Sequence, residues 1–326
     1  VPYQPFPQQW HQRYEKLEEY GIDGTLESWS SGYAPSFMTE FRAWYCWSDA
    51  PDRDELLHQI AARDFGSDQA SSVVKAWDLF SQAVRLVPDT GPYMGTTNSI
   101  GNPLFFDPPP ARTATFKYSW MDQGAWQGYL GAEINPYWPF TVTRLVFIPD
   151  FSNNSNRAEG YARGVSGIEA PGEIQVLPVF LKYLGLANEK MAEGLDLYRA
   201  AAMSSPERKR DGAFREVIVA EQIHRLLQSD QNILSFEDLR LKMVAEKDGA
   251  VVTVMLNQME DMVRDEIART KRALIAMTRD SRIGFQFEVD YVYTPYSLQE
   301  KLAVLEDTID RQIPEFRKKA GLVAGN

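Results

Sequence analysis

The strongest constraint on the fold is a series of long helical patterns in the second half of the chain. From residue 248 to 279, apolar residues recur at steps of three and four: Val251, Met255, Met259, Met262, Leu274 and Met277. Similar patterns predict helices over 172–203 and 205–244, and Ser297 with Glu300 forms a capping box that predicts a last helix to residue 319. Helices of similar length joined by short turns favour an up-and-down bundle.

Shorter helices are predicted in the first part of the chain. Their ranges are 8–20, 35–47, 52–65 and 67–87. Gly21 and Gly66 directly follow two of them, and glycine is the usual residue just past a helix C-terminus. The aromatic residues of 35–47 do not share one stripe, which predicts burial on more than one side. Cys46 lies among them and is expected to be a buried, inert thiol.

The stretch from Gly21 to Pro35 has the sequence Gly-Ile-Asp-Gly-Thr-Leu-Glu-Ser-Trp-Ser-Ser-Gly-Tyr-Ala-Pro. It follows a helix and a tight turn, and its short apolar run over 22–26 predicts a buried parallel strand. That strand would deliver Glu27 and Trp29 to a loop rich in serine and glycine. In folds built from βα repeats, chemistry occurs where strands end. Glu27 is therefore the first candidate for a functional residue.

Residues 1–7 and 21–32 resemble the closing unit of the (β/α)8 barrel in bacterial glycoside hydrolases related to β-hexosaminidases and α-glucuronidases. Residues 41–326 resemble the helical domain that follows such barrels. The resemblance implies a C-terminal portion, because a complete barrel needs about 250 residues. The implied fold is mainly α with a barrel remnant: one βα unit over 1–35, helices and long aromatic-rich loops on the barrel mouth over 36–171, and a long-helix bundle over 172–326.

The same resemblance implies a glycoside hydrolase that cleaves a terminal glycosidic bond, with the sugar at the C-terminal end of the barrel. Glycoside hydrolysis usually needs two carboxyl groups. Glu27 is then a catalytic carboxylate, or an acceptor that positions the sugar while acid and base lie on other strands, or a structural residue at the barrel rim. Trp29 either stacks on a sugar face or closes the barrel end. The resemblance also implies a periplasmic or secreted location. It further implies that the remainder of the barrel lies on the same chain or on another chain.

A second group of candidates lies where helical periodicity is lost, between residues 89 and 171. Asn135, Tyr137 and Trp138 combine an amide with two aromatic rings. Amides pair with sugar hydroxyls while rings cover the C–H face of a sugar, so the group is suited to carbohydrate binding. The alternative is a turn between prolines with two core aromatics. The whole segment is interpreted as long loops packed over the barrel mouth.

The third group lies in residues 280–296, which separate two long helical patterns with a dense set of charged and tyrosine residues. Arg282 is suited to holding a carboxylate with two hydrogen bonds, as a uronic acid substrate would require. Alternatively, Asp280, Arg282 and Glu288 form a structural ion-pair network. Arg282 and Glu288 would then either shape the pocket or lock the interface that ties the bundle to the barrel.

Charge and composition narrow the range of partners. The net charge is −11, which argues against nucleic acid and anionic membranes, since both attract a cationic surface. The single cysteine excludes a disulfide framework within the chain, and the three histidines lack metal-ligand spacing, so no cofactor and no metal are predicted. The acidic run over 259–266 is interpreted as a solvated helix face.

A second hypothesis remains open beside the hydrolase. The helices would form a non-catalytic module for carbohydrate binding or oligomerisation, with a homodimer through the helical domain as one form. Such a module would bind a ligand or associate with itself without cleaving a bond.

Overall fold

The structure is a computed structural model. It describes residues 3–25, 35–48, 51–87, 104–106, 173–286, 290–291 and 294–322. In these residues the protein is mainly α, as the sequence predicts, and the chain divides into two compact units. Unit 1 comprises residues 1–87, 185–224 and 280–288, and unit 2 comprises 88–184, 225–279 and 289–326. Two helices, α8 (Glu173–Ser204) and α9 (Glu207–Ala245), contribute residues to both units.

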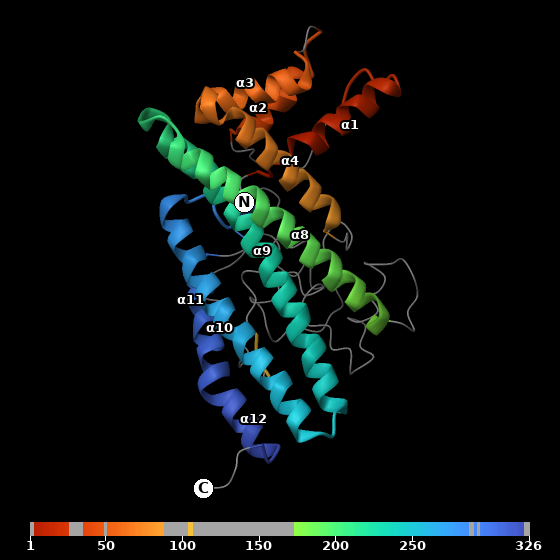
Figure 1. Cartoon of the computed structure of the whole chain (residues 1–326), viewed down its shortest axis with the longest axis vertical. Coiled ribbons are helices and arrows are strands. Elements are labelled where there is room, and N and C mark those ends of the chain that lie inside the picture. The colour runs from red at the N-terminus through yellow and green to blue at the C-terminus, as the bar shows by residue number, and fades with distance from the viewer. Residues whose placement is uncertain are drawn as a thin grey trace. The chain divides into compact units, whose positions relative to one another are not determined.

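Unit 1 is built from short helices that pack on the C-terminal part of α8 and the N-terminal part of α9 (Figure 1). Its elements in chain order are α1 (Pro7–Glu19), α2 (Phe37–Trp44), α3 (Arg53–Phe65), the 3₁₀ turn η1 (Ser67–Gln69) and α4 (Ala70–Leu86). The side chain of Asp52 caps α3 by accepting hydrogen bonds from the amides of Asp54 and Glu55 at 2.9 and 3.2 Å. Gly66, with φ of 106°, ends α3 as predicted.

The core of unit 1 is aromatic. Phe37 stacks on Trp77 with ring centroids 4.3 Å apart, and the edge of Tyr3 meets Phe37 at 5.9 Å. The indole N–H of Trp77 donates to the hydroxyl of Tyr198 at 3.1 Å, so this buried pair is satisfied. The core therefore joins α2, α4 and α8 with the segment before α1.

Gly194 marks the closest approach of α8 to α4. A Cβ atom at this position would lie 2.6 Å from Cε1 of Phe80 and 3.2 Å from the carbonyl oxygen of Ala76. Phe80 is fully buried and packs edge-on against Tyr198 at 5.5 Å, so its ring has no room to withdraw.

Gly194→Ala is therefore expected to destabilise unit 1 by about 1 kcal/mol. Overpacking costs roughly 1–3 kcal/mol, and alanine recovers about 1 kcal/mol of helix propensity. Gly212→Ala in α9 is the matched control, because nothing lies within 4 Å of its added Cβ, and it should stabilise the helix by about 0.5–1 kcal/mol. Urea unfolding of both variants measures the difference, and equal stability would contradict the close packing of α4 and α8.

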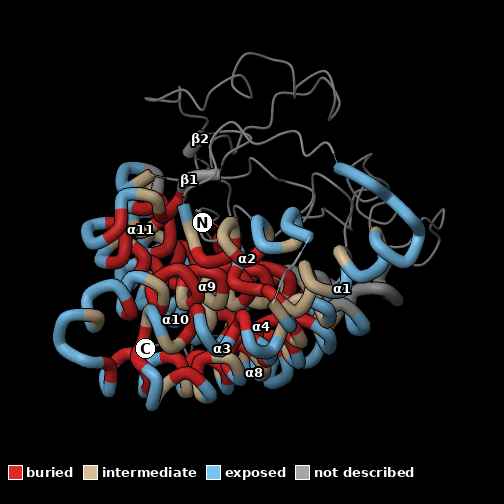
Figure 2. The backbone as a smooth tube through the Cα atoms, turned by 90° about the horizontal axis from the view of Figure 1, so that it is seen from above, coloured by how far each residue is buried: buried red, intermediate tan, exposed pale blue. Residues whose placement is uncertain are grey.

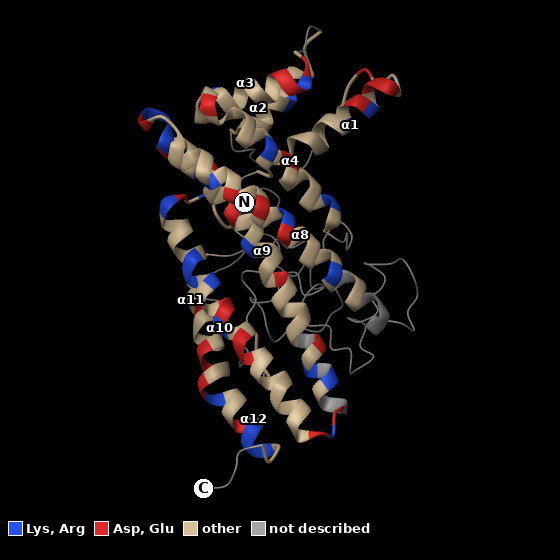
Figure 3. Ribbon diagram, viewed as in Figure 1, with Lys and Arg blue, Asp and Glu red and all other residues tan. Residues whose placement is uncertain are grey.

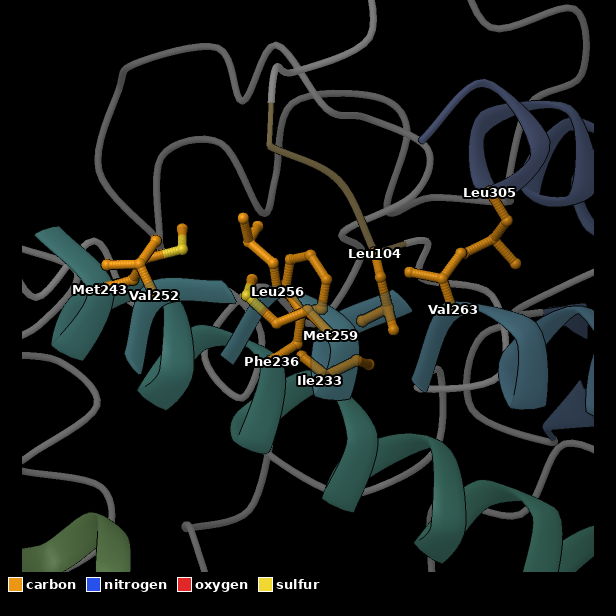
Figure 4. Close-up of a cluster of buried hydrophobic side chains, with 9 residues drawn as sticks. All are labelled: Leu104, Ile233, Phe236, Met243, Val252, Leu256, Met259, Val263 and Leu305. Carbon is orange, nitrogen blue, oxygen red and sulfur yellow. The ribbon is translucent and has the colours of Figure 1, made fainter. Parts of the chain in front are cut away.

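Unit 2 is a set of long helices that pack side by side. Its elements are the second part of α9, α10 (Gly249–Arg279), α11 (Pro295–Asp307), the π turn η4 (Thr308–Gln312) and α12 (Ile313–Lys319). The chain reverses between α9 and α10, and α11 lies beside α10 (Figure 1). Apolar side chains of all three helices meet around Leu104 in one buried cluster (Figure 4): Leu104, Ile233, Phe236, Met243, Val252, Leu256, Met259, Val263 and Leu305. The prediction of long packed helices is thus confirmed for this part of the chain.

The segment 282–291 contains two very short strands, β1 (Phe285–Gln286) and β2 (Asp290–Tyr291). Buried and exposed residues alternate along the helices, as expected where one face of each helix lies in a core (Figure 2). Among the described residues, no helix is long and apolar enough to cross a membrane.

Three local predictions for the first 50 residues are corrected by the structure. Residues 22–25 form no strand, since a parallel strand needs a partner for its hydrogen bonds and the described residues provide none here. The segment 35–47 is buried on one face only, because α2 ends at Trp44 and the chain then turns outward. Trp47 is 69% exposed and Cys46 is exposed rather than buried.

Two predictions in unit 2 are also wrong. The last helix begins at Pro295 rather than at a cap on Ser297, because proline at a first helical position is already set for the helix. The acidic run over 259–266 is not a solvated face throughout, since Glu266 is fully buried. Figure 3 shows the acidic residues in the middle of α10.

Candidate functional site

A pocket in unit 1 opens where the unusual stretch of residues 21–35 ends. Its volume is about 720 Å³, and eleven residues line it: Pro35, Ser36, Phe37, Thr39, Glu40, Arg63, Asp64, Arg208, Lys209, Gly212 and Glu216. They come from the start of α2, the end of α3 and the first turns of α9. The volume is within the range of roughly 300–1,000 Å³ that is usual for small-molecule sites. We call this cavity the Glu216 pocket.

The wall from α2 is fixed by a capping box. The amide of Thr39 donates to Oγ of Ser36 at 3.3 Å, and the amide of Ser36 donates to Oγ1 of Thr39 at 3.0 Å. These reciprocal bonds set the first turn of α2, so Glu40 faces the pocket from a rigid helix.

The wall from α3 carries an arginine that pairs with two carboxylates. Nη1 of Arg63 donates to both carboxylate oxygens of Glu40, at 2.7 and 2.6 Å, and Nε donates to Asp64 at 2.7 Å. The hydrogen bonds that Arg63 donates to Asp64 and Glu40 raise its pKa, although burial acts in the opposite direction. Nζ of Lys209 donates to the carbonyl oxygen of Ala62 at 2.9 Å and thereby ties α9 to the same wall.

Glu216 is the chemically unusual residue of the pocket. Its side chain is partly exposed, and the hydroxyl of Tyr3 donates a hydrogen bond to its Oε2. Burial raises the pKa of Glu216 to about 7, with a further raising effect of Asp64, while the bond from Tyr3 and the charge of Arg282 lower it. Burial and the neighbouring carboxylate also hold the pKa of Tyr3 well above 10.0. At neutral pH, Glu216 therefore exists in both protonated and ionised forms.

Arg282 is the one predicted site residue that the structure describes. Its guanidinium donates to both oxygens of Asp280, from Nε at 2.9 Å and from Nη2 at 2.7 Å. Burial raises the pKa of Asp280, but these bonds and the charge of Arg282 outweigh it and leave the pKa below the ordinary value. Arg282 also acts on the pKa of Glu216, so it belongs to the electrostatic environment of the pocket.

The other predicted site residues lie outside the described residues. These are Glu27, Trp29, Asn135, Tyr137, Trp138 and Glu288. Their roles stay predictions. Residues before and after the predicted loop of Glu27 and Trp29 are described, and the later ones, from Pro35 onward, lead directly into the Glu216 pocket.

Glu216 was missed by sequence reasoning, although a signal for it is present. It lies three residues after buried Ala213 and four before buried Ala220, which places a carboxylate on the apolar face of its helix. Its partner Tyr3 is 213 positions away, and no local pattern predicts that pairing.

The arrangement can bind a polar ligand and exchange a proton with it. Carboxylates, two guanidiniums, an ammonium and two hydroxyls line the cavity, and one carboxyl has a pKa of about 7. Among the described residues, no group of three or more histidine, cysteine, aspartate or glutamate side chains is placed to hold a metal ion. No known protein family, curated protein or solved structure matches this chain.

Proposed function

We propose that the chain is a portion of a glycoside hydrolase and that the Glu216 pocket takes up part of its carbohydrate substrate. The observation that supports this most directly is the carboxyl group of Glu216, which lies on the wall of a polar cavity and has a pKa of about 7. General acid catalysis and hydrogen bonding to sugars both use a carboxyl that can donate as well as accept near neutral pH.

The position of the pocket in the chain is a second support. Pro35 closes the stretch that resembles the last barrel unit, and Pro35 and Ser36 line the cavity. In the proposed enzyme the stretch over 1–35, which resembles a barrel unit, precedes helices that border the sugar site. Glu27 and Trp29 would then contact the sugar, with Asn135, Tyr137 and Trp138 as further contacts.

The proposed function predicts saturable binding of a sugar by the chain itself. Isothermal titration with N-acetylglucosamine, glucose and glucuronate tests this, and Arg208→Gln is the informative variant because Arg208 lines the pocket and is exposed. Loss of one hydrogen bond from a charged donor should weaken binding by about tenfold. Arg210→Gln is the control: it lies in the same helix but outside the pocket, so it should leave the affinity unchanged.

Two outcomes separate the hypotheses. Binding to the chain, together with cleavage of an oligosaccharide by the protein isolated from its source, supports the hydrolase. Binding without cleavage in that preparation assigns the chain to the non-catalytic carbohydrate-binding module. If no sugar binds, or if both arginine variants weaken binding equally, the Glu216 pocket is not the sugar site.

A further inference from the structure

A second cavity of unit 1 lies between α1, α3 and α4. Its volume is about 610 Å³, and it shares no lining residue with the Glu216 pocket. The residues that line it are Gln8, Gln12, Arg53, Asp54, His58, Ser71, Val74, Lys75, Asp78, Ser81, Gln82 and Arg85. We call this cavity the α4 groove.

The α4 groove is long. Its lining on α4 extends from Ser71 to Arg85, and a helix rises 1.5 Å per residue, so the groove follows about 20 Å of helix. A cavity of this length accommodates an extended ligand rather than a single compact ring.

The charges in the groove are not balanced. The guanidinium of Arg53 is neutralised by Asp54, with Nε and Oδ1 2.6 Å apart. Arg85 donates to the neutral amide oxygen of Gln12, and the carboxylate of Asp78 accepts from Gln82 at 2.7 Å. Neither Lys75 nor Arg85 forms an ion pair with any residue that the structure describes. Arg53, Lys75 and Arg85 against Asp54 and Asp78 leave the lining with one net positive charge, in a chain whose net charge is −11.

The neutral groups of the groove are hydrogen-bonding groups. The hydroxyl of Ser81 donates to Oε1 of Gln8 at 2.7 Å, and Oε1 of Gln12 accepts from Arg85. These bonds use the amide oxygens of both glutamines and leave their Nε2 groups as the donors of the two side chains. Among the described residues that line the groove, Val74 is the one apolar side chain.

We propose that the α4 groove binds a short acidic oligosaccharide, with Lys75 and Arg85 facing its anionic groups and the glutamine amides its hydroxyls. The length of the groove, its net positive charge and its amide groups each match this class of ligand. Carboxylate and sulfate groups share the chemistry that the cations recognise. The inference rests on the α4 groove alone and does not depend on the function of the Glu216 pocket.

The test is titration of the full chain with trigalacturonate, a sulfated chondroitin disaccharide and the neutral control maltotriose. Trigalacturonate or the sulfated disaccharide should bind at least tenfold more tightly than maltotriose. Lys75→Gln and Arg85→Gln should each weaken that binding by about tenfold. Affinity should also fall with added salt, since the groove is open to solvent.

Lys190→Gln is the matched control, because Lys190 is an exposed lysine of unit 1 outside the groove and its removal changes the net charge equally. Circular dichroism verifies that each variant is folded. Equal affinity for maltotriose and the acidic sugars would overturn the proposal, as would equal weakening by Lys190→Gln. Binding that Glu216→Gln abolishes while Lys75→Gln leaves it intact would assign the acidic sugar to the Glu216 pocket instead.

Discussion

Replacement of Glu266 by glutamine is expected to destabilise unit 2 by about 3–5 kcal/mol, the usual cost of removing one partner from a buried ion pair. Glu266 lies on α10 and is fully buried, as is Lys301 on α11. The carboxylate accepts hydrogen bonds from Lys301, from Arg269 and from the hydroxyl of Ser229. Burial lowers the pKa of the Lys301 ammonium, and the charge and hydrogen bond of Glu266 act in the opposite direction.

Hydrogen exchange of the amides of α10 measures this loss locally. Glu260→Gln is the control, because Glu260 lies on the same helix but pairs at its partly exposed face with Arg264 and Arg317, and it should cost about 0–1 kcal/mol. A change below 1 kcal/mol for Glu266→Gln would show that the buried network contributes little. Replacing Glu266, Arg269 and Lys301 together by apolar residues should restore much of the stability, since no buried charge then lacks a partner.

The same network predicts sensitivity of unit 2 to acid. Burial raises the pKa of Glu266, but the cations and hydrogen bonds outweigh it and hold the pKa below the ordinary 4.5. A carboxyl with a lowered pKa stabilises the folded state above its unfolded pKa and loses this contribution as the pH falls through the folded value. Unit 2 should therefore lose stability only below about pH 4.5, through this group.

Much of the helical framework is predictable because its signals are local. The predicted helix over 248–279 corresponds to α10, and that over 52–65 corresponds to α3, since an apolar stripe and the cap at Asp52 act within a few residues. The π turn at 308–312 is different: Pro314 cannot donate to the carbonyl four residues earlier, and η4 accommodates this within a continuous helical run.

The candidate site is less predictable because it depends on contacts between distant residues. Tyr3 and Glu216 meet only after α9 has packed against the segment before α1. The burial of Glu266 in an acidic run likewise depends on Lys301, 35 positions later. A carboxylate next to other acids is normally a solvated residue, and only the position of a cation on another helix reverses that expectation. Sequence patterns therefore predict where the helices lie along the chain better than they predict which charged residues of different helices pair.

The second large effect expected is a pH-dependent gain of stability in Glu216→Gln. Because the pKa of Glu216 is raised from 4.5 to about 7, the folded state binds its proton more tightly than the unfolded state. The contribution of this group to stability is complete below pH 4.5 and is lost as the pH rises through about 7. The shift corresponds to roughly 3 kcal/mol, and partial exposure of the side chain reduces this to about 2 kcal/mol.

Glutamine resembles the protonated carboxyl and carries no charge at any pH. Glu216→Gln should thus equal the native protein in stability at pH 4 and exceed it by about 2 kcal/mol at pH 8. Urea unfolding across this range measures the difference, and Glu193→Gln, an exposed carboxyl of the same unit, should show none. A carboxyl NMR titration locates the proton directly. If Glu216 instead titrates near pH 4.5 and the two proteins have parallel stability curves, Glu216 is not an acid that titrates near neutral pH. The proposed function then loses its main support.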